Sequence, residues 1–180
     1  MLRLAYAVLL GLVGAGIVHV AVLLLLPVVS ERDAWSRLAG AGDLYTVTPL
    51  YGDGAGKGVL RSIDPLFQAV ACRFDLADGV LHLGGVGRLP YWSVSVYDRG
   101  GQNIYSFNDR SATKGILDLV VLTPAQMVEV RKDLPQAYAE SVFVEADIGE
   151  GIAVVRGFVP DDSWAPSVAR ELGHLTCTAS

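Results

Sequence analysis

The chain is poor in the residues that build metal centres, redox sites and nucleic-acid interfaces. Its 180 residues include two cysteines, three histidines and three lysines, and charged residues make up 18% of the total. An acidic chain with so few lysines offers no basic surface to a nucleic-acid backbone. A second long apolar run is also missing, which excludes a protein with several membrane spans.

Common catalytic and cofactor-binding motifs are absent as well. The chain has no Gly-x-Ser-x-Gly nucleophile elbow and no His-Glu-x-x-His metal motif. The glycine-rich run 52–58 lacks the spacing of a phosphate loop and predicts a surface turn. His174 and Cys177 are too few for a metal centre, which needs three or four ligands. His82 lies between two leucines and is expected to face solvent on a strand. The sequence therefore predicts no metal and no cofactor.

The N-terminal segment is almost entirely apolar. Residues 1–30 contain 23 hydrophobic residues and one charge, Arg3. The uncharged stretch 4–26 would span about 34 Å as a helix, enough for a bilayer core of about 30 Å. Pro27 is expected to end this helix. Residues 1–29 are therefore predicted to be a transmembrane anchor.

The charges around this segment suggest its orientation. Arg3 and the amino terminus precede the span, which favours an N-terminus in the cytoplasm. We expect a single-pass protein of the inner (cytoplasmic) membrane with its C-terminal domain in the periplasm or outside the cell. A cleaved signal peptide is the alternative, with Val28 and Ser30 at the cleavage site.

Residues 30–43 are expected to form a juxtamembrane linker or a short helix. Ser30 can cap a helix start, and Gly40 and Gly42 interrupt the helical pattern. Trp35 is expected at the membrane interface, where tryptophan rings are enriched.

Residues 44–180 are expected to form a β-rich extracytoplasmic domain, because apolar and polar residues alternate along them. Strands are predicted at 44–51, 69–76, 80–83, 91–97, 103–107, 117–122, 142–146 and 152–158, with hairpin turns at 77–79, 98–101 and 149–151. Thr123, Pro124 and Gln126 predict a helix start with a capping box, and residues 161–173 predict a second short helix. The predicted fold is mainly β, an antiparallel sandwich or jelly-roll-like domain with two or three short helices, preceded by one transmembrane helix.

Two cysteines leave one disulfide open. Outside the cytoplasm Cys72 and Cys177 can pair, closing a loop of about 100 residues and fixing the last helix on the sheet. The alternative is a buried thiol at one position and a free thiol near the C-terminus at the other.

The densest polar cluster on the chain comprises Tyr97, Asp98, Asn103, Tyr105, Asn108, Asp109 and Arg110. If the flanking strands form a hairpin, these groups gather around one turn and the start of the next loop. Aromatic rings beside amides and carboxylates suit saccharide or peptide binding. Asp98 and Asp109 could also form an acid/base pair for glycoside hydrolysis. Because Asp, Asn and Gly also build turns, a purely structural role is the third alternative.

Residues 64–85 and 91–109 resemble the bacterial family called domain of unknown function 1254. The matching positions are Asp64, Phe67, Asp75, Leu76, Gly79, Tyr91, Asp98 and Asn103. The resemblance covers residues 44–158. The family commonly has Asn and then Asp-Thr-Leu-Tyr, whereas here Pro65, Leu66 and Phe67 follow Asp64, so the tyrosine hydroxyl is missing.

The resemblance implies a β-rich, jelly-roll-like domain and brings no established reaction or catalytic residues. In longer relatives a second domain follows, of the family called domain of unknown function 1214, and this chain has no room for it. The resemblance therefore implies a separate membrane-anchored partner that carries that second domain.

Together these observations predict an envelope protein and favour a binding or assembly module over an enzyme. Its expected ligand is a partner protein or a cell-surface saccharide. An envelope hydrolase that uses carboxylates near 98–109 is the alternative. A subunit that assembles only through its membrane helix is a third possibility.

Overall fold

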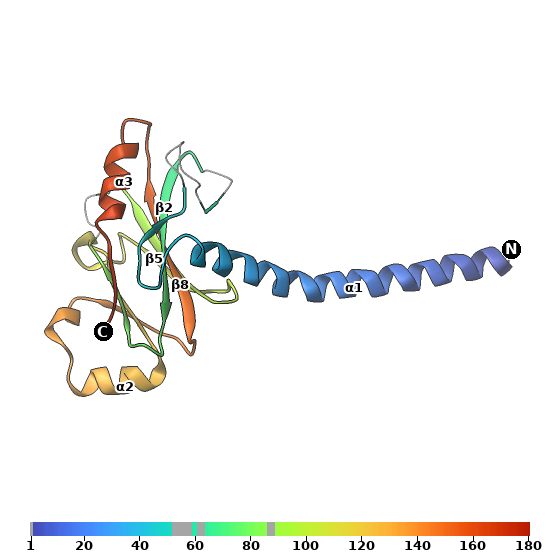
Figure 1. Ribbon diagram of the computed structural model, residues 1–180, viewed down its shortest axis with the longest axis horizontal. Helices are drawn as coiled ribbons and strands as arrows, with labels where there is room; N and C mark the ends of the chain where they lie inside the picture. The colour runs from blue at the N-terminus through green and yellow to red at the C-terminus, as the bar shows by residue number, and fades with distance from the viewer. Residues whose placement is uncertain (1, 52–58, 61–63, 86–88) are drawn as a thin grey trace.

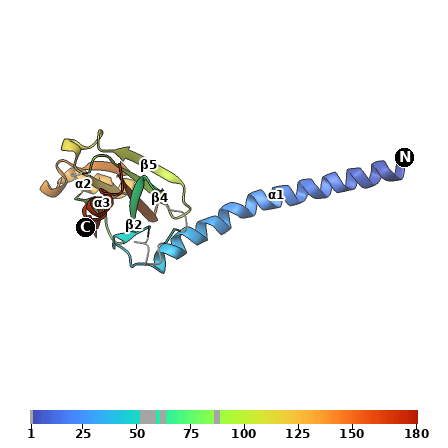
Figure 2. The same cartoon turned by 90° about the horizontal axis from the view of Figure 1, so that it is seen from above.

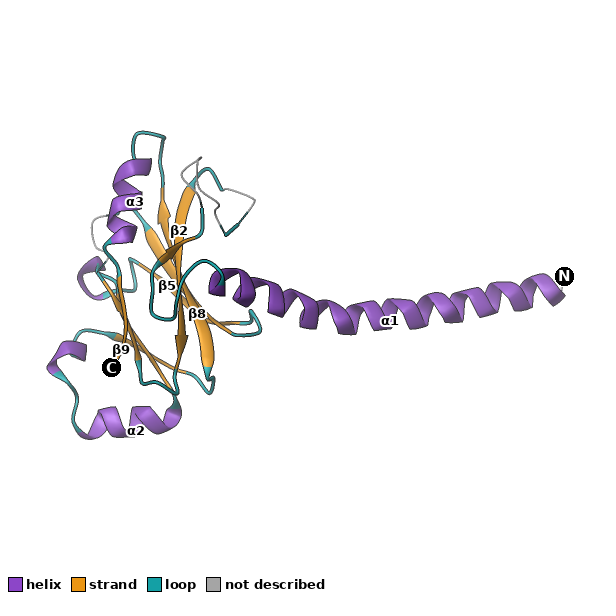
Figure 3. Ribbon diagram, viewed as in Figure 1, coloured by secondary structure: helices purple, strands orange, loops and turns teal. Residues whose placement is uncertain are grey.

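A long N-terminal helix and a sandwich of two β-sheets make up the protein (Figure 1). The computed structural model describes residues 2–51, 59–60, 64–85 and 89–180, without the side chains of residues 27–33. The surface turn predicted at 52–58 lies outside these residues. Figure 3 shows the helices lying outside the two sheets.

The five-stranded sheet has the order β1-β2-β8-β4-β5, and its neighbouring strands are all antiparallel. These strands are β1 (Thr48–Pro49), β2 (Phe67–Asp75), β4 (Trp92–Asp98), β5 (Asn103–Asn108) and β8 (Glu150–Phe158). The four-stranded sheet has the order β7-β6-β3-β9. It contains β3 (Leu81–Gly84), β6 (Asp118–Leu122), β7 (Val142–Glu145) and β9 (Thr176–Ala179), and only β6 and β7 run parallel.

Short helices connect the strands. They are α2 (Pro124–Lys132), α3 (Ala165–Gly173) and the 3₁₀ turns η1 (Thr113–Gly115) and η2 (Gln136–Tyr138). The capping box predicted for α2 is present, because the Thr123 side chain accepts the Gln126 N–H and the Gln126 side chain accepts the Thr123 N–H. The predicted mainly β sandwich with short helices and an apolar N-terminal helix is thus confirmed.

The core lies between the sheets because alternate residues of each strand point inward. Val94 and Val96 on β4 and Leu119 and Val121 on β6 are essentially inaccessible to solvent. Trp92 is also fully buried, and its ring meets the Phe107 ring edge-on with centroids 5.8 Å apart.

Only one of the three predicted hairpins forms, between β4 and β5. The turn at 77–79 leads from β2 in one sheet to β3 in the other, and the segment at 149–151 follows the crossing from β7 to β8. The chain crosses because each sheet buries its apolar face against the other. The strand predicted at 44–51 shrinks to Thr48–Pro49, and β9 was not predicted, since only one of its four residues is buried.

A disulfide joins the two sheets. Cys72 on β2 is bonded to Cys177 on β9, with Cα atoms 6.6 Å apart and a sequence separation of 105 residues. The bond therefore holds the last strand, rather than the last helix, against the opposite sheet. It also removes Cys177 as a metal ligand beside His174.

The helix α1 (Leu2–Ala39) is longer than the sequence suggested. It continues through Pro27, so the predicted end at that residue is wrong, and residues 30–39 of the predicted linker belong to the same helix. Proline removes one backbone hydrogen bond, a loss that apolar membrane helices tolerate. The segment Leu2–Leu26 of α1 has a mean hydropathy of 2.6. It is long and apolar enough to cross a membrane, a property that signal sequences share.

The last turns of α1 pack onto the domain. Trp35 is only 8% exposed and, with Leu38, covers the face of the five-stranded sheet that points away from the other sheet, here called the outer face. Their neighbours there are Leu50, Ala69, Ala71, Ile152 and Val154. The Trp35 ring thus packs on the protein itself, and its position at the membrane interface stays a prediction. Figures 1 and 2 show α1 leaving the domain from this outer face.

Candidate functional site

A band of polar side chains crosses the outer face of the five-stranded sheet beside the end of α1. This polar strip consists of Ser95 and Tyr97 on β4, Asn103 and Ser106 on β5, and Arg156 on β8. The β4–β5 register places Ser95 opposite Ser106 and Tyr97 opposite Asn103. Because side chains alternate along a strand, these residues face outward while their neighbours fill the core.

Hydrogen bonds link the members of the polar strip. The Arg156 guanidinium donates to the Ser95 hydroxyl oxygen at 3.2 Å and to the Tyr97 hydroxyl oxygen at 3.3 Å. The Ser106 hydroxyl donates to Ser95 at 2.9 Å, and the Asn103 amide donates to Ser106 at 2.9 Å. The strip is therefore a connected network across three strands.

The network changes the acidity of Tyr97. Burial raises the pKa of Tyr97, but the hydrogen bond from Arg156, further hydrogen bonds with Ser95 and Asn103, and the Arg156 charge lower it. The net result is a pKa below the ordinary value of 10.0. The direction shows that the guanidinium favours a negative charge at this point of the sheet.

Two further arginines surround Trp35 at the end of α1. The guanidinium carbons of Arg73 and Arg99 lie 4.9 Å and 5.2 Å from the centroid of the Trp35 ring. Arg73 also donates to the Gly42 carbonyl at 2.8 Å, and Arg99 forms an ion pair with Glu150. These contacts fix α1 to both β2 and the β4–β5 turn, next to the polar strip.

The structure divides the polar cluster predicted from the sequence. Tyr97, Asp98 and Asn103 lie where the β4–β5 hairpin turns, and the Asp98 carboxylate accepts the Gln102 backbone N–H at 2.9 Å. The predicted group Asn108, Asp109 and Arg110 lies at the far end of β5. There Asn108 accepts the Arg110 backbone N–H at 3.1 Å. The groups therefore lie at the turn and at the start of the next loop, as expected, but these two places are at opposite ends of the hairpin and do not form one cluster.

The two aspartates of the proposed acid/base pair are far apart. Asp98 ends β4, whereas the Asp109 backbone N–H is bonded to the carbonyl of Trp92 at the start of that strand. Six residues of strand separate Trp92 from Asp98, or about 20 Å. Glycosidase carboxyl groups lie only about 5–9.5 Å apart. Asp98 and Asp109 thus do not form such a pair.

Tyr105 is separated from the polar strip by the sheet itself. It lies opposite Val96, and its ring is 6.0 Å from that of Phe107, which is in the core. A shift in register between Val96 and Tyr97 changes the facing of the residues that follow. Of the seven predicted residues, Tyr97 and Asn103 belong to the polar strip, whose other members the sequence did not single out. Ser95 alternates with buried valines like any outward serine, so nothing local marks it.

A second polar cluster lies on the four-stranded sheet. The His82 ring is 2.9 Å from the Asp118 carboxylate, which also accepts the Ser141 hydroxyl at 2.7 Å. Tyr138 places its ring against the imidazole, with centroids 5.1 Å apart. His82 is therefore paired and partly covered rather than facing solvent. Because Ser141 bonds the carboxylate and not the imidazole, this is not the arrangement of an activated serine.

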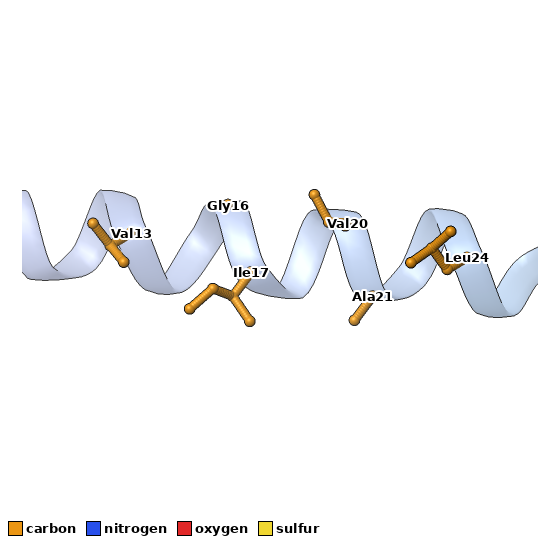
Figure 4. Close-up of a pocket in the computed structure, with 6 residues that line it drawn as sticks. All are labelled: Val13, Gly16, Ile17, Val20, Ala21 and Leu24. Atoms are coloured by element: carbon orange, nitrogen blue, oxygen red, sulfur yellow. The ribbon is translucent and has the colours of Figure 1, made fainter.

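The apolar part of α1 has a shallow hollow but no polar lining. It is formed by Val13, Gly16, Ile17, Val20, Ala21 and Leu24, at helical spacing on one side (Figure 4). Such a surface suits lipid chains or another apolar helix. Within the described part of the chain, no three His, Cys, Asp or Glu side chains are grouped so that they could hold a metal ion.

Comparison with known proteins shows the fold and no function. No family model and no curated protein matches the chain. The VPA0106 protein from Vibrio parahaemolyticus is similar over 85% of this chain, with 12% sequence identity and a TM-score of 0.53. An uncharacterised protein from Burkholderia cenocepacia is similar over 82%, with 14% identity and a TM-score of 0.51. In each case the chain covers only 38% of the larger protein.

Proposed function

We propose that this protein is a membrane-anchored, non-catalytic assembly module of the bacterial envelope. In this proposal it is a short member of the domain of unknown function 1254 family. Its partner is a separate membrane protein that carries the domain of unknown function 1214. The observation that carries the proposal is that the fold corresponds to 38% of two larger proteins, whereas here it follows an apolar helix.

The proposed location follows from α1. A single helix spans the inner membrane with its N-terminus in the cytoplasm, and the sandwich lies in the periplasm or outside the cell. Because Trp35 and Leu38 are buried on the sheet, the domain is attached directly to the helix without an intervening flexible linker. Such an attachment presents the domain to a partner in a fixed orientation.

A saccharide fits the polar strip less well than a polypeptide does. Sugar rings are commonly held against an exposed aromatic face. Tyr97 turns toward the Trp35 cluster, and Tyr105 lies on the other face of β5. The hydrolase alternative loses support because Asp98 and Asp109 lie at opposite ends of the hairpin.

Native mass spectrometry of the full-length protein, extracted in mild detergent from its own membrane, tests the proposal. We expect the added mass of a second polypeptide. The mass of the bare monomer would contradict stable assembly, and added mass from a sugar would favour saccharide binding. The mass of the chain itself also tests whether the N-terminal segment is retained.

A helix exchange shows which part of the chain holds the partner. Leu2–Leu26 would be replaced by an unrelated apolar helix of the same length, which keeps the anchor but removes the hollow around Gly16. Retention of the partner is expected if the sandwich makes the contact. Loss of the partner would move the contact to the membrane helix.

A further inference from the structure

The polar strip contains a partly buried arginine that is held by neutral groups. Within the described residues the ion pairs are His82–Asp118, Arg99–Glu150, Lys114–Glu140 and Glu129–Lys132, and Arg156 belongs to none of them. Its described hydrogen bonds go to the hydroxyl oxygens of Ser95 and Tyr97, one from each terminal nitrogen. A guanidinium has five N–H donors in a planar fork, so donors remain for an anion.

The position of α1 indicates that the outer face of the five-stranded sheet is turned toward the membrane. Trp35, which is buried on the domain, follows Leu26 by nine residues, which is about 14 Å along a helix. The headgroup layer of a bilayer is about 5–7 Å thick on each side. When Leu2–Leu26 spans the membrane, Trp35 therefore lies about 7–9 Å beyond the headgroup layer, and the outer face, from which α1 emerges (Figure 2), is turned toward the membrane.

We propose that the polar strip binds the phosphate group of an anionic phospholipid in the leaflet next to the domain. The Arg156 fork donates to the phosphate oxygens, and the second N–H of the Asn103 amide supplies a further donor on β5. This inference rests on the membrane anchoring in the proposed function. It goes beyond that function by assigning a lipid contact that fixes the rotation of the domain about α1.

Charge and hydrogen-bond geometry distinguish a lipid phosphate from the two other candidate ligands of the strip, a saccharide and a partner polypeptide. A phosphate takes the bidentate geometry of a guanidinium and supplies the negative charge that the strip lacks. A saccharide would leave the Arg156 charge uncompensated, and a partner polypeptide would need a carboxylate placed at the same point. The direction of α1 favours lipid, because the face from which the helix emerges (Figure 2) is turned toward the headgroups when Leu2–Leu26 spans the membrane.

The test uses the full-length protein in nanodiscs of phosphatidylcholine alone or of an equimolar mixture with phosphatidylglycerol. Native mass spectrometry counts the lipids that stay bound after release. We expect preferential retention of phosphatidylglycerol by the wild type. The Arg156→Gln variant is expected to retain it about tenfold less, the size of effect that follows from losing a charged hydrogen bond. Arg156→Lys keeps the charge without the fork and is expected to lie between the two.

Arg170→Gln is the matched control, because it makes the same change of charge at an exposed position on α3. Retention should be as high as in the wild type. Equal retention by Arg156→Gln and Arg170→Gln would overturn the proposal, as would equal retention of phosphatidylcholine. Circular dichroism confirms that each variant is folded.

The pKa of Tyr97 supplies a second readout at the strip. A bound phosphate competes for Arg156 and adds a negative charge, so the pKa of Tyr97 should rise with phosphatidylglycerol more in the wild type than in Arg156→Gln. Inorganic phosphate, added to the protein in a neutral detergent, distinguishes the source of the anion. A response to free phosphate without one to phosphatidylglycerol would overturn the lipid assignment.

Native mass spectra of the same variants, each extracted in mild detergent from its own membrane, separate this inference from the assembly function. Arg156→Gln is expected to lose the lipid and keep the partner polypeptide. Loss of both from Arg156→Gln, with both kept by Arg170→Gln, would make the strip a contact for the partner and overturn the lipid site. A wild type that retains lipid but no partner polypeptide would contradict the assembly function and support the lipid site.

Discussion

At the scale of single residues, the contact between Arg156 and Tyr97 determines the electrostatics of the outer face. A guanidinium bonded to two hydroxyl oxygens stabilises nearby negative charge, and the lowered pKa of Tyr97 reports this. The sequence marks Tyr97 but not its pairing with Arg156, because Arg156 lies in an apolar stretch 59 residues away along the chain. Their contact depends on β8 lying next to β4.

The lowered pKa of Tyr97 predicts a gain in stability at alkaline pH. Below the folded pKa the tyrosine is neutral in both states and its ionisation contributes nothing. As pH rises from there toward 10.0, only the folded state ionises, so the free energy of unfolding increases relative to Tyr97→Phe. Denaturant unfolding of both proteins from pH 7 to 10 measures this. A constant difference across that range would contradict the lowered pKa.

Asp98 is expected to act in a turn and not in catalysis. Its carboxylate accepts the Gln102 N–H, so Asp98→Ala should lose about 1 kcal/mol of unfolding free energy. Asp98→Asn keeps a carbonyl acceptor and should lose less. Denaturant titration compares the two variants. An Asp98→Asn variant with unchanged stability and ligand binding but no turnover would instead indicate an enzyme, as would the same result for Asp109→Asn.

At the scale of elements, the contact between α1 and the five-stranded sheet connects the membrane segment to the domain. The end of α1 has a defined packing position on the sheet. Trp35 and Leu38 are buried there, and two arginines lie against the Trp35 ring. The predicted linker therefore became part of the tertiary structure. Its apolar residues looked like a membrane-interface motif because a sequence does not show which apolar surface a tryptophan meets.

Removing the Trp35 ring should weaken the packing of α1 on the five-stranded sheet. We expect Trp35→Ala to lower the unfolding free energy by about 3–5 kcal/mol, the cost of a large cavity. Backbone amides of Ala71 and Ile152, beneath the ring, should exchange hydrogen faster. The control is Trp164→Ala, because that ring is 42% exposed and its removal should cost clearly less. Equal losses from both variants would contradict the packing of Trp35 on the sheet.

At the scale of the whole molecule, one covalent bond and one buried core hold the two sheets together. The disulfide joins β2 to β9, and the inward residues of both sheets share a single cluster that includes both cysteines. Strands that are distant in the chain therefore become neighbours. This arrangement makes the stability of the sandwich depend on the redox state of its surroundings.

Reduction of the disulfide should destabilise the sandwich substantially. A closed loop of 105 residues is worth up to about 4.7 kcal/mol in the chain-entropy account. Denaturant unfolding with and without a thiol reductant measures the loss. A variant with both Cys72→Ala and Cys177→Ala should start at the lower stability and not respond to reductant. A wild type that is indifferent to reductant would contradict the bond.

The sequence by itself determined the elements whose cause is local. The apolar run of α1, the alternation in β2 and β4, the continuous apolar run of β6, the turn after Asp98 and the Thr123 capping box all follow from spacing and side-chain chemistry within a few residues. It also predicted the fold class, because short alternating strands must bury one face against a second sheet. Two members of the polar strip, Tyr97 and Asn103, were found because they flank a predicted turn.

Only the tertiary structure decided which strands pair and what the outer face carries. The predicted hairpins at 77–79 and 149–151 became crossings between sheets, since burial of two apolar faces outweighs pairing with the nearest strand. The same arrangement separated Asp98 from Asp109 and brought Arg156 to Tyr97. Pairing across the sandwich depends on contacts between residues far apart in the chain, and local periodicity carries no information about these contacts.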